Sequence, residues 1–170
     1  MKSKLFFLFS LFFLVLLFPS KAFAEEIKQF NVKLEVLQNA DLKVSETILY
    51  NFGENQKHGI FREIPLIMTN QSGKKFRLKV ENVNVPNWSN STNLTNSSLT
   101  IKIGDPNVLL SGIKIYQINY TVLGALTYFS DHDELYWNIT GNSWQVAIEK
   151  TQATILLPET GLIKKVACYT

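Results

Sequence analysis

The sequence lacks the short motifs that identify many enzymes, because it contains no Gly-x-Ser-x-Gly, no P-loop and no His-Glu-x-x-His. Histidine is also scarce, with His58 and His132 as the only two. These absences exclude the commonest signatures of serine hydrolases, nucleotide-binding proteins and zinc proteases. We therefore expect no cofactor and no metal. A hydrolase that uses two carboxylates needs no such motif and stays an alternative.

Residues 1–24 have the pattern of a cleaved signal peptide. A basic start is followed by an apolar run from Leu5 to Phe18 and by an Ala-x-Ala sequence that ends at Ala24. The apolar run is shorter than the roughly 20 residues that a membrane-spanning helix needs, although a short uncleaved anchor is an alternative. Both interpretations predict that residues 25–170 form one exported domain on the extracytoplasmic side of the cell membrane or envelope.

Excess charge of one sign is also absent after residue 24. The whole chain has 17 Lys and Arg residues against 14 Asp and Glu residues, and removal of Lys2, Lys4 and Lys21 with the leader leaves 14 of each. No basic surface interleaved with aromatic side chains remains, and nucleic-acid binding depends on such a surface. We expect no nucleic-acid partner.

The chain contains a single cysteine, Cys168. Exported proteins favour disulfides, and an odd cysteine in such a protein indicates a partner elsewhere. We expect a disulfide between Cys168 and a cysteine outside this chain, and we interpret the chain as part of a longer protein. A buried, unpaired thiol is the alternative.

Helical spacing is almost absent, and apolar residues alternate with polar ones along most of the mature chain, which is typical of strands with one buried face. The predicted fold is all-β: an antiparallel β-sandwich, immunoglobulin-like in general architecture, with about eight strands. A long connection is expected over residues 53–75, and a polar loop over residues 87–98 that carries four Asn-x-Ser/Thr sequons. The expected strands are 30–36, 42–50, 76–80, 99–103, 113–122, 134–139, 144–148 and 151–157.

The segment "DHDELYWNITGNSW", residues 131–144, combines acids, a histidine and two tryptophans. Its adjacent acids cannot converge on one ion, because neighbouring side chains of an extended chain point to opposite sides. We expect a β-hairpin in which Gly141 belongs to the turn and Trp137 and Trp144 anchor the core. Asp131 and Asp133 are then left in solvent at the mouth of the hairpin.

A second candidate is "HGIFREIP", residues 58–65. Ile60, Phe61 and Ile64 are too apolar for a free loop, so we expect this segment to pack on the domain. Arg62 and Glu63 could bind an anionic ligand or form structural ion pairs. We treat Arg62, Glu63, Asp131 and Asp133 as a possible interaction surface.

A third segment, "IGDPN" at residues 103–107, is predicted to form a turn rather than a calcium site, because Asp105 before a proline is a common turn start and one Asp with Asn107 supplies few ligands. Gly112 is expected to lead the chain into the next strand.

Three ordered motifs carry a resemblance to a known family: "GIFREIP", "IGDPNVLLSGIKIYQINYTVLGAL" and "DHDELYWNITGNSWQVAIEKTQATILLP". Over essentially all of residues 27–170 the chain resembles the domain-of-unknown-function 2207 family, the YciQ-like predicted membrane proteins of bacteria and archaea. The polar segment 87–98 departs from the family pattern.

The resemblance implies an exported N-terminal β domain followed by membrane-spanning helices, so the membrane is a partner through segments beyond this chain. It also implies a second cysteine in a glycine-rich stretch beyond residue 170, with which Cys168 could pair. No activity or catalytic residue comes with the family, so its motifs imply only candidate recognition positions.

We expect the domain to be a binding or interaction module that presents a surface to a protein or glycan partner, and we do not expect an enzyme. One alternative is a structural cap or assembly domain for the membrane helices. The other is an envelope hydrolase that uses Glu134 or Asp133 together with Glu63, which requires these carboxylates to share a cleft.

Overall fold

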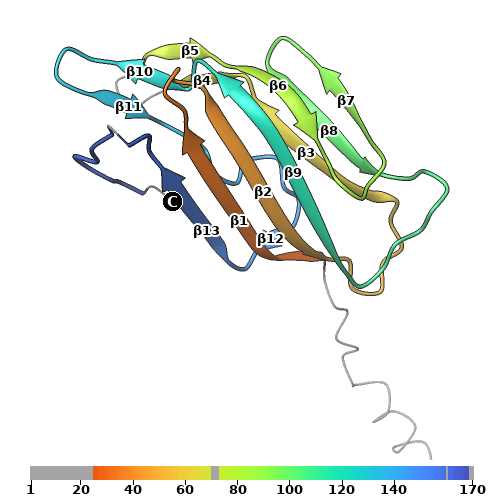
Figure 1. Cartoon of the computed structure of the whole chain (residues 1–170). Coiled ribbons are helices and arrows are strands. Elements are labelled where there is room, and N and C mark those ends of the chain that lie inside the picture. Colours follow the sequence, from red (N-terminus) through yellow and green to blue (C-terminus); the bar gives the residue numbers. More distant parts are fainter. Residues whose placement is uncertain (1–24, 70–72, 160, 169–170) are drawn as a thin grey trace, which may run out of the picture.

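The computed structural model describes residues 25–69, 73–159 and 161–168 (Figure 1). The expected signal peptide, residues 1–24, lies outside this part. The described residues form strands and no helix, so none of them forms an apolar helix long enough to cross a membrane. The strands are β1 (Glu26–Val36), β2 (Leu42–Asn51), β3 (Gly59–Pro65), β4 (Ile67–Thr69), β5 (Lys75–Arg77), β6 (Lys79–Asn84), β7 (Asn90–Leu94), β8 (Ser98–Gly104), β9 (Ile113–Leu123), β10 (Leu126–Tyr128), β11 (Asp133–Leu135), β12 (Ala147–Ile148) and β13 (Thr151–Leu156).

The largest sheet is built around three long antiparallel strands, β1, β2 and β9, and β6 extends it beyond β9. On the other edge, β12 and β13 pair with successive parts of β1, and both pair in parallel. These strands form where apolar residues recur at every second position, as Leu42, Val44 and Ile48 do on the buried side of β2.

A three-stranded sheet, β3-β8-β7, lies behind the large sheet in the view of Figure 1. Two further pairs, β4-β5 and β10-β11, are short hairpins. Buried side chains of both sheets belong to one hydrophobic core, to which the large sheet contributes Phe30 and Ile118 and the smaller one contributes Ile64 and Ile101. The all-β class is therefore confirmed, whereas the immunoglobulin-like sandwich stays a prediction.

Several expected elements differ from the structure. The long connection expected over residues 53–75 contains β3 and β4, and the polar segment 87–98 contains β7, whose five residues are all exposed. The sheet is not wholly antiparallel, because β12 and β13 run parallel to β1. Phe61 does not pack on the domain: it occupies an outward position of β3 and is 61% exposed.

The expected hairpin of residues 134–148 is wrong. β11 pairs instead with the preceding strand β10, and β12 pairs with β1. Between them, residues 136–146 form no strand. Alternating apolar residues in this stretch are partly buried without a strand partner, because they pack against the hydrophobic core from an irregular segment.

Two glycines make the close pairing of β3 with β8 possible. Gly59 and Gly104 are register partners with φ angles of 143° and 135°. A Cβ at Gly59 would lie 1.9 Å from the carbonyl oxygen of Ile103, so no other residue fits without moving the strand. The expected turn also forms, since the backbone N–H of Asn107 donates to Asp105 Oδ1 at 2.8 Å.

Candidate functional site

A fully buried ion pair joins the two sheets. Arg62 of β3 donates from Nε to Glu46 Oε2 and from Nη2 to Glu46 Oε1, both at 2.8 Å, and Glu46 lies on β2. The hydroxyl of Tyr120, on β9, donates to Glu46 Oε1 at 2.6 Å. The side chains of Arg62 and Glu46 are 2% and 0% exposed. Such a bidentate ion pair fixes the relative position of the strands that carry it.

The rest of the Arg62 guanidinium is satisfied as well. Its Nη1 donates to the carbonyl oxygen of Glu63 at 2.8 Å and to that of Thr140 at 3.0 Å. Its Cζ lies 5.5 Å from the centre of the Phe30 ring, within the range of a cation–π contact. All of the guanidinium nitrogens therefore have partners inside the protein, which is the condition for burying a charge.

Residues 138–144, called here the capping segment, close over Arg62. Trp144 Nε1 donates to the same Thr140 carbonyl at 2.9 Å, and the Trp144 ring packs edge-on against Phe30 with centroids 6.0 Å apart. The backbone N–H of Gly141 donates to Asn138 Oδ1 at 2.9 Å, which holds the turn. The sequence motifs around Arg62 and Trp144 thus meet in space.

Gly141 has no room for a side chain. Its φ is 77°, and a Cβ there would lie 2.5 Å from Arg62 Nη1 and 3.4 Å from the Glu63 carbonyl oxygen. Because Arg62 is held by hydrogen bonds on every side, it cannot move away cheaply. The expected turn role of Gly141 therefore has a second cause in the buried arginine.

The electrostatics of the cluster favour the charged pair. Burial opposes the charged form of Arg62, but the charge and hydrogen bonds of Glu46 more than offset it and raise the pKa of Arg62 above its usual range. Burial, followed by the charge of Glu46, raises the pKa of Tyr120 well above the ordinary value. At neutral pH Tyr120 is thus a neutral donor to a carboxylate that also binds a cation. The arrangement is structural and offers no group to solvent.

Arg62 was expected at an interaction surface, and its burial removes it from any such surface. The signal that would have placed it inward is its register: Ile60, Arg62 and Ile64 alternate on one face of β3. Glu46 has the same signal, since it interrupts the inward row of β2 between Val44 and Ile48. One charge of each sign at inward positions of two strands indicates a buried pair.

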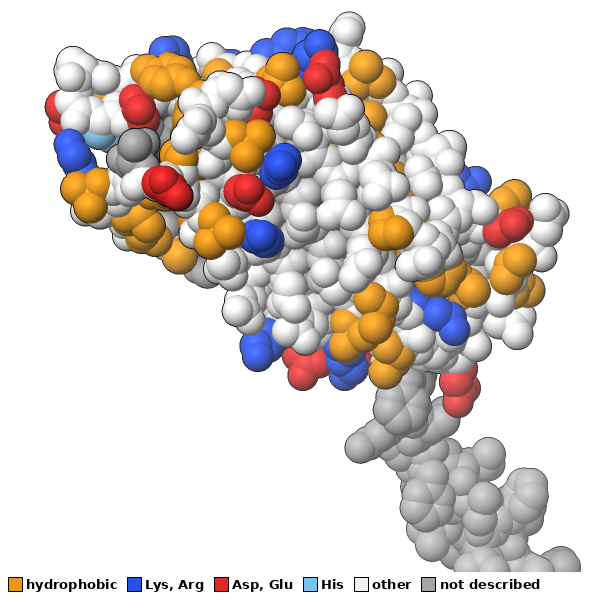
Figure 2. All heavy atoms as spheres, in the orientation of Figure 1, with side chains coloured by type: hydrophobic (Ala, Val, Ile, Leu, Met, Phe, Trp, Pro, Cys, Tyr) orange, Lys and Arg blue, Asp and Glu red, His pale blue; other side chains and the backbone are white. Residues whose placement is uncertain are grey.

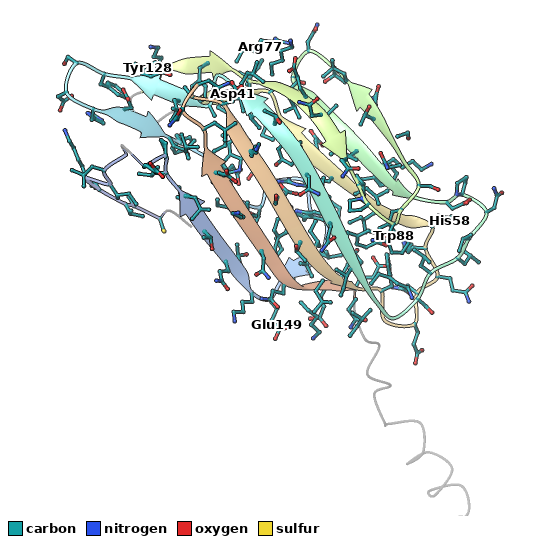
Figure 3. All side chains as sticks on the ribbon, in the orientation of Figure 1. Asp41, His58, Arg77, Trp88, Tyr128 and Glu149 are labelled. Atoms are coloured by element: carbon teal, nitrogen blue, oxygen red, sulfur yellow. The ribbon has the colours of Figure 1, made fainter. Side chains whose placement is uncertain are left out.

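The two aspartates of that surface do not contact Arg62, whereas Glu63 follows it directly in β3. Asp131 and Asp133 are exposed at the tip of the β10-β11 hairpin, near Tyr128, which Figure 3 shows at the opposite end of the molecule from His58 and Trp88. The half-buried Glu63 uses its carbonyl oxygen toward Arg62. Within the described residues, no hydrogen bond or ion pair links either aspartate to Arg62 or Glu63.

The tip of the β10-β11 hairpin has its own local contacts. Asp131 Oδ1 lies 2.8 Å from His132 Nδ1, the His132 ring stacks on Phe129 at 4.8 Å, and Lys164 Nζ donates to the Asp131 carbonyl oxygen at 2.9 Å. The hydrogen bond from His132 lowers the pKa of Asp131. These contacts bring the last described segment of the chain against the hairpin.

The two tryptophans of the motif both pack against the core, as expected for structural residues. They differ in their polar atoms. Trp144 donates to Thr140, whereas Trp137 Nε1 is buried without a hydrogen-bond partner among the described residues. A shallow depression beside Arg62 is lined in part by Ile64, Met68 and Trp137. It is mostly apolar and holds no set of catalytic groups.

Two rows on the outer face of the large sheet have an unusual composition, and we call their eight residues the neutral face. In register across four strands, one row contains Gln152, Asn31, Thr47 and Gln117, and the next contains Thr154, Lys33, Ser45 and Asn119. Seven of these eight side chains are uncharged amides or hydroxyls. Figure 2 views this side and shows few charged or apolar side chains over the middle of the sheet.

The polar groups of the neutral face are largely uncommitted. A hydrogen bond from Gln29 Nε2 to Asn31 Oδ1, at 3.0 Å, is the one that its uncharged side chains make within the part of the chain described by the structure. Next to these rows, Ile115 lies on the same face, paired with Leu49, and Ile113 follows; Ile113 and Ile115 are more than half exposed. A hydrogen-bonding area thus borders an apolar one.

Metal chemistry finds no support in the side-chain arrangement: the described residues contain no group of three or more His, Cys, Asp or Glu side chains that could hold an ion. Cys168 is exposed and has no disulfide partner among those residues. Its expected pairing with a cysteine outside the chain stays a prediction.

Residues 26–170 match the family described as "Predicted membrane protein (DUF2207) N-terminal domain". The chain belongs to this family. The similarity that was expected from three sequence motifs is therefore confirmed, and the family description makes this the N-terminal domain of a predicted membrane protein. It states no activity or ligand.

The chain is also similar to "Uncharacterized protein YciQ" of Escherichia coli (strain K12), with 29% identity over 142 residues. The match covers 79% of this chain and 22% of that relative. The chain thus spans about a fifth of the length of the curated relative it matches. Any activity or partner of the whole protein is a matter for proposal.

Proposed function

We propose that this domain is an extracytoplasmic, non-catalytic binding module of a membrane protein and that its neutral face binds an uncharged glycan. The observation that carries the proposal is the pair of rows across β13, β1, β2 and β9, in which seven of eight side chains are uncharged hydrogen-bonding groups. An ordinary solvated sheet face mixes charges of both signs.

Amides and hydroxyls both donate and accept hydrogen bonds, as sugar hydroxyls do. Asn31, Thr47, Gln117 and Asn119 could therefore exchange bound water for sugar hydroxyls in either direction. Each exchange contributes only about 0.5–1.5 kcal/mol, so a useful affinity requires several contacts at once. The array across four strands supplies several on one face of the sheet.

The apolar border adds the second part of the chemistry. Leu49 and Ile115 are register partners, and Ile113 lies two residues before Ile115 on the same strand. Sugar rings carry C–H faces that can pack on such side chains, which supplies the dispersion and apolar burial that hydrogen bonds alone lack. Lys33, the one charged residue of the two rows, lies 3.8 Å from the Glu35 carboxylate of the next row, and this balance of charge favours a neutral glycan over an acidic one.

Binding of the purified full-length protein to an immobilised panel of neutral and acidic oligosaccharides tests the proposal. We expect retention on neutral members and a loss of about two- to tenfold in affinity for each contact removed. The informative variant is Thr47→Ala with Gln117→Ala, because both side chains lie in one row. A matched control is Thr100→Ala with Gln56→Ala, which removes the same two groups away from the neutral face.

Retention that is equal for both double variants, or that occurs only on acidic members, contradicts the proposal. Binding to a protein bait through the same row, with no retention on any oligosaccharide, would replace the glycan by a protein partner.

The two alternative functions, an envelope hydrolase and a cap or assembly domain, can be tested separately. The hydrolase requires Glu63 to act with Asp133 or Glu134, and activity on envelope polymers that Glu63→Gln abolishes would support it over a binding module. A cap or assembly role is supported by full-length protein that fails to insert or assemble when residues 25–170 are deleted.

A further inference from the structure

β13 continues the core-facing side of the large sheet. Its register with β1 pairs Phe30 with Thr151, Val32 with Ala153 and Leu34 with Ile155. Register partners of neighbouring strands point to the same side of a sheet. Ala153 and Ile155 therefore point to the side on which Val32 and Leu34 are buried.

The two strands differ sharply in what covers that side. Leu34 is 0% exposed, whereas its partner Ile155 is 41% exposed, and every residue of β13 is exposed. The three-stranded sheet and the capping segment cover β1 but do not extend over β13. A core-facing row that ends in solvent at the last strand is an incomplete core.

The exposed apolar surface continues along the chain after β13. Leu162, Ile163 and Val166 are all exposed, and Leu162 is the most exposed of them at 82%. Figure 2, which views the outer face of the large sheet, shows apolar side chains near the segment that follows β13. Lys164 ties this segment to the β10-β11 hairpin through the Asp131 carbonyl oxygen.

We infer that the core-facing side of β13 is a docking surface, and that its occupant is the polypeptide that follows Thr170 in the full-length protein. The matched part is only 22% of the curated relative, so the family includes proteins with a long continuation. Thr170 is only 14 residues beyond Leu156, the last residue of β13, so a later segment of the same chain is tethered close to the uncovered row.

The geometry favours a polypeptide cover over a lipid surface. The outer side of the same strand carries Gln152 and Thr154, which align with Asn31 and Lys33 of the solvated face, and ends at Leu156, which aligns with Glu35. A bilayer that covered the edge strand β13 would also contact the polar side chains Gln152 and Thr154 on its outer side. A packed polypeptide segment would contact only the side of Ala153 and Ile155. The inference is independent of the glycan proposal, which uses the opposite side of the sheet.

Cysteine labelling of the full-length protein in its membrane tests this inference. Ile155→Cys and Thr154→Cys are compared in a background without other cysteines, because the two neighbouring side chains point to opposite sides of β13. We expect Ile155→Cys to react at least about tenfold more slowly than Thr154→Cys, because a covered thiol reacts only when the structure opens locally. Thr154→Cys and a second control, Leu94→Cys on β7, should react fast.

Equal, fast labelling of both positions of β13 overturns the inference. Protection of both positions, or protection of Ile155→Cys that is lost when detergent replaces the bilayer, assigns the surface to lipid and overturns it as well. Protection that disappears on dilution in detergent assigns it to a second copy of the protein. Protection that persists under both conditions, and only at Ile155→Cys, supports the stated occupant.

Discussion

At the scale of single residues, a charged pair replaces apolar side chains at the centre of this fold. Arg62 and Glu46 each stand in a row of apolar residues that faces the core. A buried pair of this kind is no guarantee of extra stability, since desolvation costs as much as the attraction contributes. It does make the packing selective, because only one relative position of β2, β3 and the capping segment satisfies all of its hydrogen bonds.

Loss of one partner is expected to be severe. Arg62→Ala leaves the Glu46 carboxylate buried without its cation and should lower the free energy of unfolding by about 3–5 kcal/mol, as measured by urea denaturation. Arg77→Ala is the matched control, because Arg77 is exposed and should cost less than about 0.5 kcal/mol. Equal effects of the two substitutions would mean that the cluster does not support the fold.

The burial of individual side chains was predictable from the sequence only where the alternation of apolar and polar residues was unbroken. Ile60 and Ile64 were expected to pack inward, and they do. Arg62 lies between them, but its charge suggested a surface role, because a lone arginine is rarely buried. Its partner, Glu46, is 16 residues away in the sequence, and only the packing of the two sheets on each other brings the two side chains together.

At the scale of elements, the capping segment explains why a stretch with strand-like alternation is not a strand. Residues 138–144 contribute a backbone carbonyl to Arg62 and an indole to the core, and both require an irregular path. A regular hairpin would direct the Thr140 carbonyl to a neighbouring strand. Tertiary contacts thus override the local preference for β structure.

Two glycines with nearly equal φ angles allow the cost of the backbone conformation to be measured apart from the cost of a steric contact. Gly141 and Gly73 have φ angles of 77° and 79°, and a Cβ at Gly73 meets no atom of the described residues within 4 Å. Gly73→Ala should therefore cost about 1–2 kcal/mol for the left-handed backbone alone. Gly141→Ala should cost about 1–3 kcal/mol more in urea denaturation, because its methyl group presses on Arg62. Equal losses would show that the contact is relieved without cost.

At the scale of the whole molecule, three buried tyrosines link stability to alkaline pH. Burial raises the pKa of Tyr50, Tyr116 and Tyr120 above the ordinary value near 10; the charge of Glu25 adds to the effect for Tyr50, and that of Glu46 does so for Tyr120. The folded state therefore keeps protons that the unfolded state releases. This contribution to stability is complete below about pH 10 and is lost as the pH rises toward the folded pKa values.

The free energy of unfolding should consequently fall above pH 10, by at most about 1.4 kcal/mol per pH unit for each tyrosine. Tyr116→Phe isolates one contribution, because the Tyr116 hydroxyl is buried and has no hydrogen-bond partner among the described residues. The variant should keep its stability at pH 7 and lose it less steeply in denaturation at pH 10–11. An unchanged slope would contradict the assignment to Tyr116.

The sequence alone was sufficient for the all-β class and for membership of the family, because alternation and ordered motifs are properties of local sequence. It was also sufficient for the turn at Asp105, which depends on neighbours two residues away. Strand partners were not accessible in this way. β11 pairs with β10, and β12 pairs with β1. These pairings depend on which strand edges the rest of the fold leaves free, and no single segment encodes that.

Tertiary structure alone decided the position of the candidate residues. It buries Arg62 against Glu46, leaves Asp131 and Asp133 exposed at the tip of the β10-β11 hairpin, and aligns the uncharged side chains of four strands on one face of the sheet. These outcomes depend on register, which links residues separated by tens to more than a hundred positions in the chain. Register is set by the packing of all strands on a common core, so the sequence of one strand cannot specify it.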